Sequence, residues 1–377
     1  MATTKSITIV GAGPAGLAAA ITAARGGARV VVHERRPAVG ARFHGDFQGL
    51  ENWTTEEDAL DELRSFGIEP SFYHTPSSRL VVFDPAGGEV STASRRPLFY
   101  QVRRGSDRSS LDSALRAQAE ALGVEICFND PCLTLPDGGI VAHGPRRADA
   151  VAIGYVFETE ATDGAFLAIS DALAPKGYAY LLIHDGRGTV ASCIFDDFHR
   201  EKTYLERTVE FFSARAGLRM RERRRFGGLG NVAYPATARK GNILFAGESA
   251  GFQDALAGFG MRYAMTSGHL AARAILEGRP EAYDHAWKQR LGRSIRAGIV
   301  NRYVYERVGA RACAFLVRKL ARGLDVGHVL HGLYAGSWWH ALVYPLARRS
   351  RVIGSPVLPC VRDDCACTWC ACHREAA

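Results

Sequence analysis

The chain has 377 residues, of which 47% are hydrophobic and 23% charged, so it can form two domains around substantial cores. No stretch reaches the roughly 18 uninterrupted apolar residues of a membrane span and none resembles a signal peptide, so we expect a cytoplasmic protein with reduced cysteines. The net charge is +8, but no nucleic-acid-binding module is present, which argues against nucleic acid as a partner.

The first predicted elements form a β-α-β unit. An apolar strand over residues 6–10 leads into a glycine-rich turn at 11–16, and a helix is predicted over 17–25. A second strand, 28–32, ends at Glu34. A G-x-G-x-x-G turn between strand and helix, with an acid 23 residues after its first glycine, is typical of a dinucleotide-binding unit.

Each part of this unit has a predicted role. Gly11 permits the tight turn, Gly13 lets the backbone approach a pyrophosphate, and Gly16 lets helix and strand pack closely. The helix N-terminus offers free N–H groups and a positive dipole end. Glu34 can accept hydrogen bonds from both hydroxyls of an adenosine ribose. The nucleotide-binding residues predicted here are Gly11, Gly13, Pro14, Ala15, Gly16 and Glu34.

The middle of the chain alternates between strands and helices. Short β-like runs lie within 70–98, and the apolar residues of 109–123 fall on one helical stripe. Four β-rich runs within 151–198 predict an antiparallel sheet, with a hairpin turn at 185–188. A buried strand at 242–246 precedes a long helix, and further helices follow.

This order predicts an α/β fold: a Rossmann-like FAD-binding domain with an inserted antiparallel β-sheet substrate domain and a helical C-terminal region. The nucleotide domain is expected to be discontinuous, because a second glycine-rich site must return to the same cofactor; two sequential domains are the alternative. The predicted boundaries are 1–69, 99–150 and 226–280 for the FAD-binding domain, 70–98 and 151–225 for the substrate domain, 281–358 for the helical region and 359–377 for a cysteine-rich tail.

The second glycine-rich site follows the strand at 242–246. Residues 247–251 read Gly-Glu-Ser-Ala-Gly, and Gly258-Phe259-Gly260-Met261 opens the next helix. An isoalloxazine ring suits such a place, because the negative charge that develops on a reduced flavin is stabilised by a helix N-terminus. The alternative is a glycine-rich helix start that binds no ligand.

The two glycine sites together resemble the flavoprotein superfamily that holds aromatic hydroxylases, flavin halogenases and geranylgeranyl reductases. The superfamily's G-D-A-A-G segment is matched at 247–251, with Glu248 where Asp is usual. Residues 263–272 are similar to the Y-A-M-x-S-G-x-x-A-A helix of the geranylgeranyl reductase branch. The halogenase segment W-x-W-x-I-P is absent. The resemblance covers about residues 1–280.

The resemblance implies FAD as the cofactor and further residues beside it. An arginine that precedes an F-D-x-x-L helix reaches towards the flavin nucleotide in the superfamily. Arg103, Arg104 and Arg108 precede the matching helix here, which leaves this position open. The further cofactor-binding residues predicted are Arg35, Arg42, Arg104, Gly247, Glu248, Gly258, Phe259, Gly260 and Met261.

The implied reaction needs a hydride from the flavin and a proton from another group. His44 is the nearest proton carrier after Glu34, and the alternative is that it is a structural or surface residue. Residues 175–182 resemble the reductase segment P-x-x-Y-x-W-x-F-P, which makes Tyr178 and Tyr180 the other predicted catalytic residues. No second nucleotide fingerprint appears, so the electron donor, NAD(P)H or another carrier, stays open.

The C-terminal segments carry two further patterns. The metal ligands predicted in the tail are Cys365, Cys367, Cys370 and Cys372, four thiols within eight residues. Redox thiols and a tail without a site are the alternatives, because the spacing matches no standard zinc finger. Upstream, aromatic and aliphatic residues among arginines at 333–351 predict either an interfacial helix or a buried lid.

The leading functional prediction is an FAD-dependent oxidoreductase of the geranylgeranyl reductase type. It would reduce C=C bonds of an apolar, isoprenoid or lipid substrate, and peripheral membrane contact would suit such a substrate. An FAD-dependent monooxygenase is the first alternative. The second is a redox- or metal-responsive protein that uses flavin and the cysteine tail as a sensor.

Overall fold

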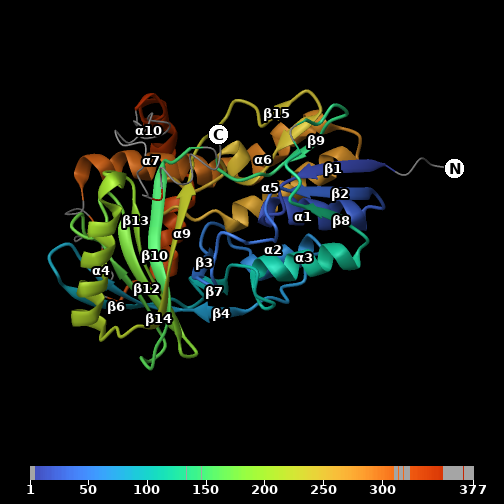
Figure 1. Cartoon of the computed structure of the whole chain (residues 1–377). Helices are drawn as coiled ribbons and strands as arrows, with labels where there is room; N and C mark the ends of the chain where they lie inside the picture. Colours follow the sequence, from blue (N-terminus) through green and yellow to red (C-terminus); the bar gives the residue numbers. More distant parts are fainter. Residues whose placement is uncertain are drawn as a thin grey trace.

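The computed structural model describes residues 5–132, 134–145, 147–309, 313, 317, 323–350 and 368. Figure 1 shows two main sheets side by side, a seven-stranded sheet at the left and a six-stranded sheet at the right. A three-stranded sheet lies below and between them. No helix in the described part of the chain is long and apolar enough to cross a membrane.

The six-stranded sheet contains both strands of the predicted dinucleotide-binding unit, and we call it the nucleotide sheet. Its order is β15-β16-β9-β1-β2-β8, and all neighbours are parallel except β15 and β16. β1 lies inside the sheet, where Ile7 and Ile9 are fully buried. The strands are β1 (Ser6–Val10), β2 (Arg29–Glu34), β8 (Glu125–Phe128), β9 (Gly139–Val141), β15 (Arg239–Lys240) and β16 (Ile243–Phe245).

Helices α1 (Pro14–Arg25) and α5 (Met261–Leu276) pack against this sheet, and α3 (Leu111–Ala121) packs against α1. The C-terminal helices join the same hydrophobic core through Tyr283 and Trp287 of α6 and through Ile295 of α7. These helices are α6 (Tyr283–Arg290), α7 (Gly292–Val308), α9 (Val326–Tyr334) and α10 (Trp338–Arg349). The helical C-terminal region therefore packs against α5 through α6 and shares the hydrophobic core of the six-stranded sheet.

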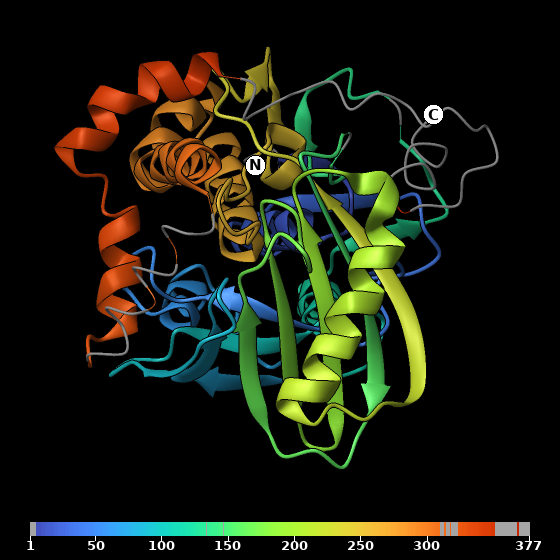
Figure 2. The same ribbon diagram turned by 90° about the vertical axis from the view of Figure 1, so that its left-hand side faces the viewer.

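The seven-stranded sheet has the order β14-β10-β13-β12-β11-β5-β6. Helix α4 (Glu201–Ala216) crosses one face of it, as Figure 2 shows, and buries Phe212 there. The hairpin predicted at 185–188 is confirmed: Asp185 and Gly186 both have positive φ, as a type I′ turn requires. The strands are β5 (Arg79–Phe83), β6 (Glu89–Ala93), β10 (Ala150–Glu158), β11 (Gly164–Ala168), β12 (Tyr178–His184), β13 (Arg187–Ile194) and β14 (Arg221–Gly230).

The inserted sheet differs in detail from the predicted boundaries. β4 (His74–Ser77) lies in the 70–98 segment, but it pairs with β7 (Phe99–Arg103) of the three-stranded sheet β3-β7-β4. β14 runs across the predicted boundary at 225/226, because it pairs along the whole length of β10. The predicted fold class is confirmed: a Rossmann-like α/β unit carries an inserted, mostly antiparallel sheet. The remaining named elements are β3 (Phe47–Glu51) and α2 (Ala59–Ser65).

Small residues bring the two glycine sites together. A Cβ on Gly268 of α5 would lie 2.1 Å from the carbonyl oxygen of Ala15 in α1. A Cβ on Gly16 would lie 1.8 Å from the carbonyl oxygen of Gly11, and Gly11 itself has φ +100°. Gly11 thus adopts the positive φ of a tight turn, Gly16 lets the helix approach that turn closely, and α1 and α5 contact each other through backbone.

Replacing Gly16 or Gly268 with alanine is expected to lower the free energy of unfolding by about 1–3 kcal/mol or more, because the new methyl group meets backbone that cannot move aside. Gly332→Ala is the matched control. Its Cβ meets nothing within 4 Å, so we expect it to be neutral or to stabilise α9 by up to about 1 kcal/mol. Urea unfolding of the three variants measures this; equal stabilities would contradict the tight crossing.

Candidate functional site

A cavity of about 790 Å³ lies where the two main sheets meet. This is within the range of small-molecule and cofactor sites. Its walls come from the first glycine turn, the chain after Glu34, the second glycine turn and one face of the seven-stranded sheet. Residues from far-apart stretches of the sequence therefore surround one space.

The first glycine turn opens into this cavity. A Cβ on Gly13 would meet nothing within 4 Å, and Gly13 is the N-cap of α1 without a side-chain hydrogen bond. The first N–H groups of the helix are thus left to a ligand. Of the residues predicted in this turn, Gly11, Gly13, Pro14 and Ala15 line the cavity, whereas Gly16 lies in the helix–turn contact.

Glu34 is held at the end of β2 by two backbone donors. Its carboxylate accepts hydrogen bonds from Ala12 N at 2.8 Å and from Arg36 N at 2.9 Å. Glu34 and its neighbours Arg35 and Arg36 line the cavity. A fixed carboxylate at this place can accept further hydrogen bonds from the hydroxyls of a sugar.

The structure distinguishes the three arginines that the sequence left open. Arg104 lines the cavity, whereas Arg103 and Arg108 do not. Nε and Nη2 of Arg104 donate to the two carboxylate oxygens of Asp112 at 2.8 and 2.9 Å. The Arg104 guanidinium also lies 4.3 Å from the centroid of the Phe43 ring. Arg104 is therefore a rigid, buried cation in the wall.

Arg42 and Glu248 face each other across the cavity wall. Nη2 of Arg42 lies 3.9 Å from Oε2 of Glu248, and both residues line the cavity. Burial raises the pKa of Glu248, against the attraction of Arg42 and Arg104. The glutamate that stands where the superfamily usually has aspartate thus points into the cavity, towards positive charge.

The second glycine turn lies directly against the first. A Cβ on Gly247 would come within 3.0 Å of the Ala15 Cβ, and Gly247 N donates to Ser267 Oγ at 2.9 Å. Gly247 therefore packs behind the cavity, against Ala15 and Ser267, and does not line it. The residues of this predicted site that line the cavity are Glu248, Gly258, Phe259, Gly260 and Met261.

Tyr178 and Tyr180 project from β12 into the cavity. The Tyr178 hydroxyl donates to the Ala257 carbonyl at 2.5 Å, which ties the inserted sheet to the second glycine turn. Burial raises the pKa of both tyrosines well above the usual value. Cys193, opposite Tyr178 on β13, also lines the cavity, and burial raises the pKa of its thiol to about 12. All three groups stay protonated.

His44 is placed outside this site. It is exposed, it is not among the lining residues, and its backbone N donates to Asp46 Oδ1 at 3.1 Å. Its loop is turned so that Phe43 is buried and Arg42 faces the cavity instead. The structure therefore corrects the expectation that His44 lies beside the reacting atoms.

Two lining residues that the sequence did not reveal carry unpaired buried atoms. Nε1 of Trp53 and Oε1 of Gln253 have no hydrogen-bond partner among the described residues. Both residues line the cavity, and Trp53 contacts Phe259 edge to face at 5.2 Å. Buried polar atoms are normally paired, so these two fit a ligand with polar edges.

Behind the second glycine turn, Arg302 of α7 donates to three carbonyls. They belong to Ala255, Leu256 and Lys176, and the guanidinium lies 3.7 Å from the Phe195 ring centroid. Arg302 therefore joins α7 to the turn and to the loop that enters β12. Next to it, buried Asp254 accepts from Ala257 N at 2.5 Å and from the Tyr334 hydroxyl at 3.0 Å.

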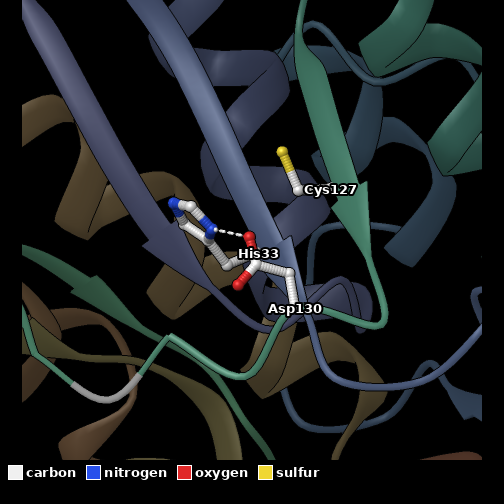
Figure 3. Close-up of side chains that lie close together, drawn as sticks. All are labelled: His33, Cys127 and Asp130. Carbon is white, nitrogen blue, oxygen red and sulfur yellow. Dashed lines mark hydrogen bonds and ion pairs between the residues drawn. The ribbon is translucent and has the colours of Figure 1, made fainter.

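A third group of side chains lies on the nucleotide sheet. Figure 3 shows His33 of β2 bonded to Asp130, through Nδ1 and Oδ2 at 2.8 Å, with Cys127 of β8 nearby. Desolvation, Glu125 and Asp130 all raise the pKa of the Cys127 thiol. This disfavours the thiolate, which is the form that binds a metal. We interpret the pair of His33 and Asp130 as a structural link between strand ends.

The predicted ligands Cys365, Cys367, Cys370 and Cys372 lie outside the described residues.

Comparison with known proteins supports the fold. Residues 9–78 match the family of NAD(P)-binding Rossmann-like domains. A thiamine thiazole synthase of Thermococcus kodakarensis is 38% identical over 65 residues, 17% of this chain and 26% of that protein. A methylenetetrahydrofolate–tRNA-(uracil-5-)-methyltransferase of Hyphomonas neptunium is 31% identical over 187 residues, 47% of this chain. The match spans only 36% of that enzyme's length.

Solved structures match over almost the whole chain. A geranylgeranyl bacteriochlorophyll reductase-like protein of Thermoplasma acidophilum has a TM-score of 0.70 at 18% identity, covering 93% of this chain and 98% of its own. A flavin-dependent brominase has a TM-score of 0.66 at 16% identity, covering 92% and 98%. A p-nitrophenol 4-monooxygenase of Pseudomonas putida reaches 0.61 at 15% identity, covering 89% and 98%. At these identities the likeness shows the fold.

Asp254 makes a pH-dependent prediction. Burial raises its pKa from 3.8 to about 6, so the folded chain holds a proton that the unfolded chain has released. The contribution of this proton to the free energy of unfolding is therefore complete below about pH 4, and it is lost as the pH rises through about 6. We expect the free energy of unfolding of Asp254→Asn, relative to the unsubstituted chain, to rise by on the order of 2–3 kcal/mol over this window. Parallel pH profiles would contradict the assignment.

Proposed function

We propose that this protein is an FAD-dependent oxidoreductase that reduces C=C bonds of an apolar, isoprenoid or lipid substrate. The observation that carries the proposal is the cavity of about 790 Å³, in which two glycine turns form one part and an apolar sheet face forms the other. The likeness to a geranylgeranyl bacteriochlorophyll reductase-like structure supports it.

The residues at the nucleotide end fit FAD. The N-terminus of α1 and the open space over Gly13 would hold the pyrophosphate, and Glu34 would hold the adenosine ribose. The unpaired Nε1 of Trp53 and Oε1 of Gln253 lie on the wall formed with the second glycine turn, where polar edges of the ring system would find partners. When bound and reduced, FAD would supply a hydride.

The substrate end is apolar. Phe166, Leu167 and Leu182 of the inserted sheet line it, together with Leu330 and Leu333 of α9. Most ionisable lining groups belong to the nucleotide end, and Lys176 is paired with Asp196 at 2.8 Å. Such a surface favours an apolar chain over a charged substrate, because an unpaired charge gains no partner there.

The proton would come from the inserted sheet. Tyr178, Tyr180 and Cys193 carry protons on the apolar wall of the cavity. Because Tyr178 is engaged with the Ala257 carbonyl, we assign it the positioning of the second glycine turn. Tyr180 and Cys193 are then the candidates for contact with the alkene.

The rival function is an FAD-dependent monooxygenase, which the likeness to a p-nitrophenol 4-monooxygenase structure favours. The electron donor, NAD(P)H or another carrier, stays a prediction. So does metal binding by the cysteine tail, which is independent of the cavity.

Anaerobic reduction followed by mixing tests the proposal. The purified protein, reduced without oxygen, is mixed with polyprenyl alkenes, and we expect the flavin to be reoxidised and the product to gain two hydrogens per double bond. Reoxidation that requires oxygen, with an oxygenated product, would instead establish the monooxygenase. If neither a reduced nor an oxygenated product forms, both enzymes are rejected and the redox-responsive alternative is favoured.

Gly13→Val tests the cofactor site separately. A valine side chain would fill the open space over the α1 N-terminus, so we expect the retained flavin to fall by about tenfold or more. The free energy of unfolding of the flavin-free chain should fall by no more than about 1–2 kcal/mol, the cost of a valine at an N-cap, because no neighbouring atom is displaced. Gly332→Val, whose Cβ also meets nothing, serves as the control that keeps its flavin. Full flavin content in Gly13→Val would rule out this site.

A further inference from the structure

Helix α10 is apolar on both of its faces. Its inner face packs on the core through Trp339, Val343 and Ala347. Its outer face presents Trp338, Leu342 and Leu346, whose exposed fractions are 77%, 67% and 58%. A surface helix normally turns polar residues outward, and one that is apolar all round belongs in a core or in lipid.

The three exposed side chains form one stripe. They are spaced four residues apart, so they follow one another along the same side of the helix. They are half of the large hydrophobic residues that are exposed in the described part of the chain, the others being Leu122, Val308 and Leu324. In Figure 2, α9 and α10, coloured orange-red to red, run along the outer left edge of the molecule.

The charge around this stripe has one sign. Arg348 and Arg349 are exposed at the end of α10, and Arg293 and Arg296 are exposed on α7, against which α10 packs. Residues 335–350 contain no acid. The acids on the packed helices are Asp325, which caps α9, and Glu306, near the C-terminal end of α7.

We propose that the outer face of α10 docks this protein on an anionic lipid surface. Trp338, Leu342 and Leu346 would enter the interface between headgroups and acyl chains, and the four arginines would contact lipid phosphates. A second copy of the chain fits less well, because three side chains on one helix offer little beside the roughly 800 Å² per partner of a stable dimer.

The position of α9 gives this surface a use. α9 precedes α10 by a short turn at Gly336, and its Leu330 and Leu333 line the cavity. The same helical pair thus borders both the docking face and the apolar half of the cavity. The docking itself does not depend on the flavin, so the proposal stands or falls apart from the proposed reaction.

Co-sedimentation of the full chain with vesicles tests the proposal. We expect binding to vesicles of phosphatidylcholine with phosphatidylglycerol at low salt, little binding to phosphatidylcholine alone, and release as salt screens the arginines. The triple variant Trp338→Ser, Leu342→Ser, Leu346→Ser should bind at least about tenfold more weakly. The double variant Arg348→Ala, Arg349→Ala should bind these vesicles about tenfold to thirtyfold more weakly.

Leu122→Ser, at a distant exposed apolar residue, is the matched control and should bind as the unsubstituted chain does. Because the substituted side chains are exposed, we expect all variants to fold as the unsubstituted chain does. Equal thermal stability of the variants checks this. The second readout is the fluorescence emission of Trp338, obtained as the difference between the spectra of the unsubstituted chain and of Trp338→Phe. This emission should shift to the blue only when anionic vesicles are present.

Absence of vesicle binding would overturn the proposal. So would binding that the stripe variant leaves unchanged. A dimer in solution that the triple variant converts to a monomer would also overturn it, since a second copy would then cover the face. A blue-shifted Trp338 emission without vesicles would do the same, because the chain itself would then cover the helix.

Discussion

The contact between α1 and α5 is the constraint on which the site depends. Gly268 lets α5 touch the backbone of Ala15, and Gly247 lets the second turn reach the same alanine. Residues separated by more than two hundred positions are thereby held within van der Waals distance. A larger side chain at this crossing would separate the helix N-termini that border the cavity. Close packing at this crossing therefore brings together the walls of a cavity whose lining includes both Glu34 and Gly260.

Buried charges then fix the start of α5. Arg262, only 2% exposed, pairs with Glu62 of α2 and donates to Thr55 Oγ1 and to the Glu57 carbonyl. Breaking a buried pair costs several kcal/mol, because the remaining charge has no partner. Nη1 of Arg262 also lies 4.0 Å from Oε2 of Glu51, so the segment held in this way includes Trp53 of the cavity wall. Arg302 has the corresponding task on the other side of the turn.

Local signals in the sequence were sufficient where the determinant is local. The first turn and the hairpin at 185–188 each depend on glycines and neighbours within a few residues, and both are found as predicted. Arg104 was predicted, but Arg103 and Arg108 could not be excluded, because the distinction rests on the pairing of Arg104 with Asp112 across a turn. Trp53, Gln253 and Cys193 belong to no motif, and only tertiary packing brings them to the cavity. His44 was expected there because of its chemistry, whereas burial of its neighbour Phe43 decides the direction of the loop.

The two parts of the cavity follow different rules. The charged and glycine-rich part lies at the carboxyl ends of parallel strands, where α/β sheets bind nucleotides whatever reaction follows. Structures with this fold belong to a brominase, a monooxygenase and a reductase-like protein, so the fold alone does not select the chemistry. The selection must come from the other part, where β11, β12, β13 and α9 present Phe166, Tyr180, Cys193 and Leu330. These side chains can change without disturbing the α1–α5 contact, which is how one nucleotide-binding scaffold can serve several reactions.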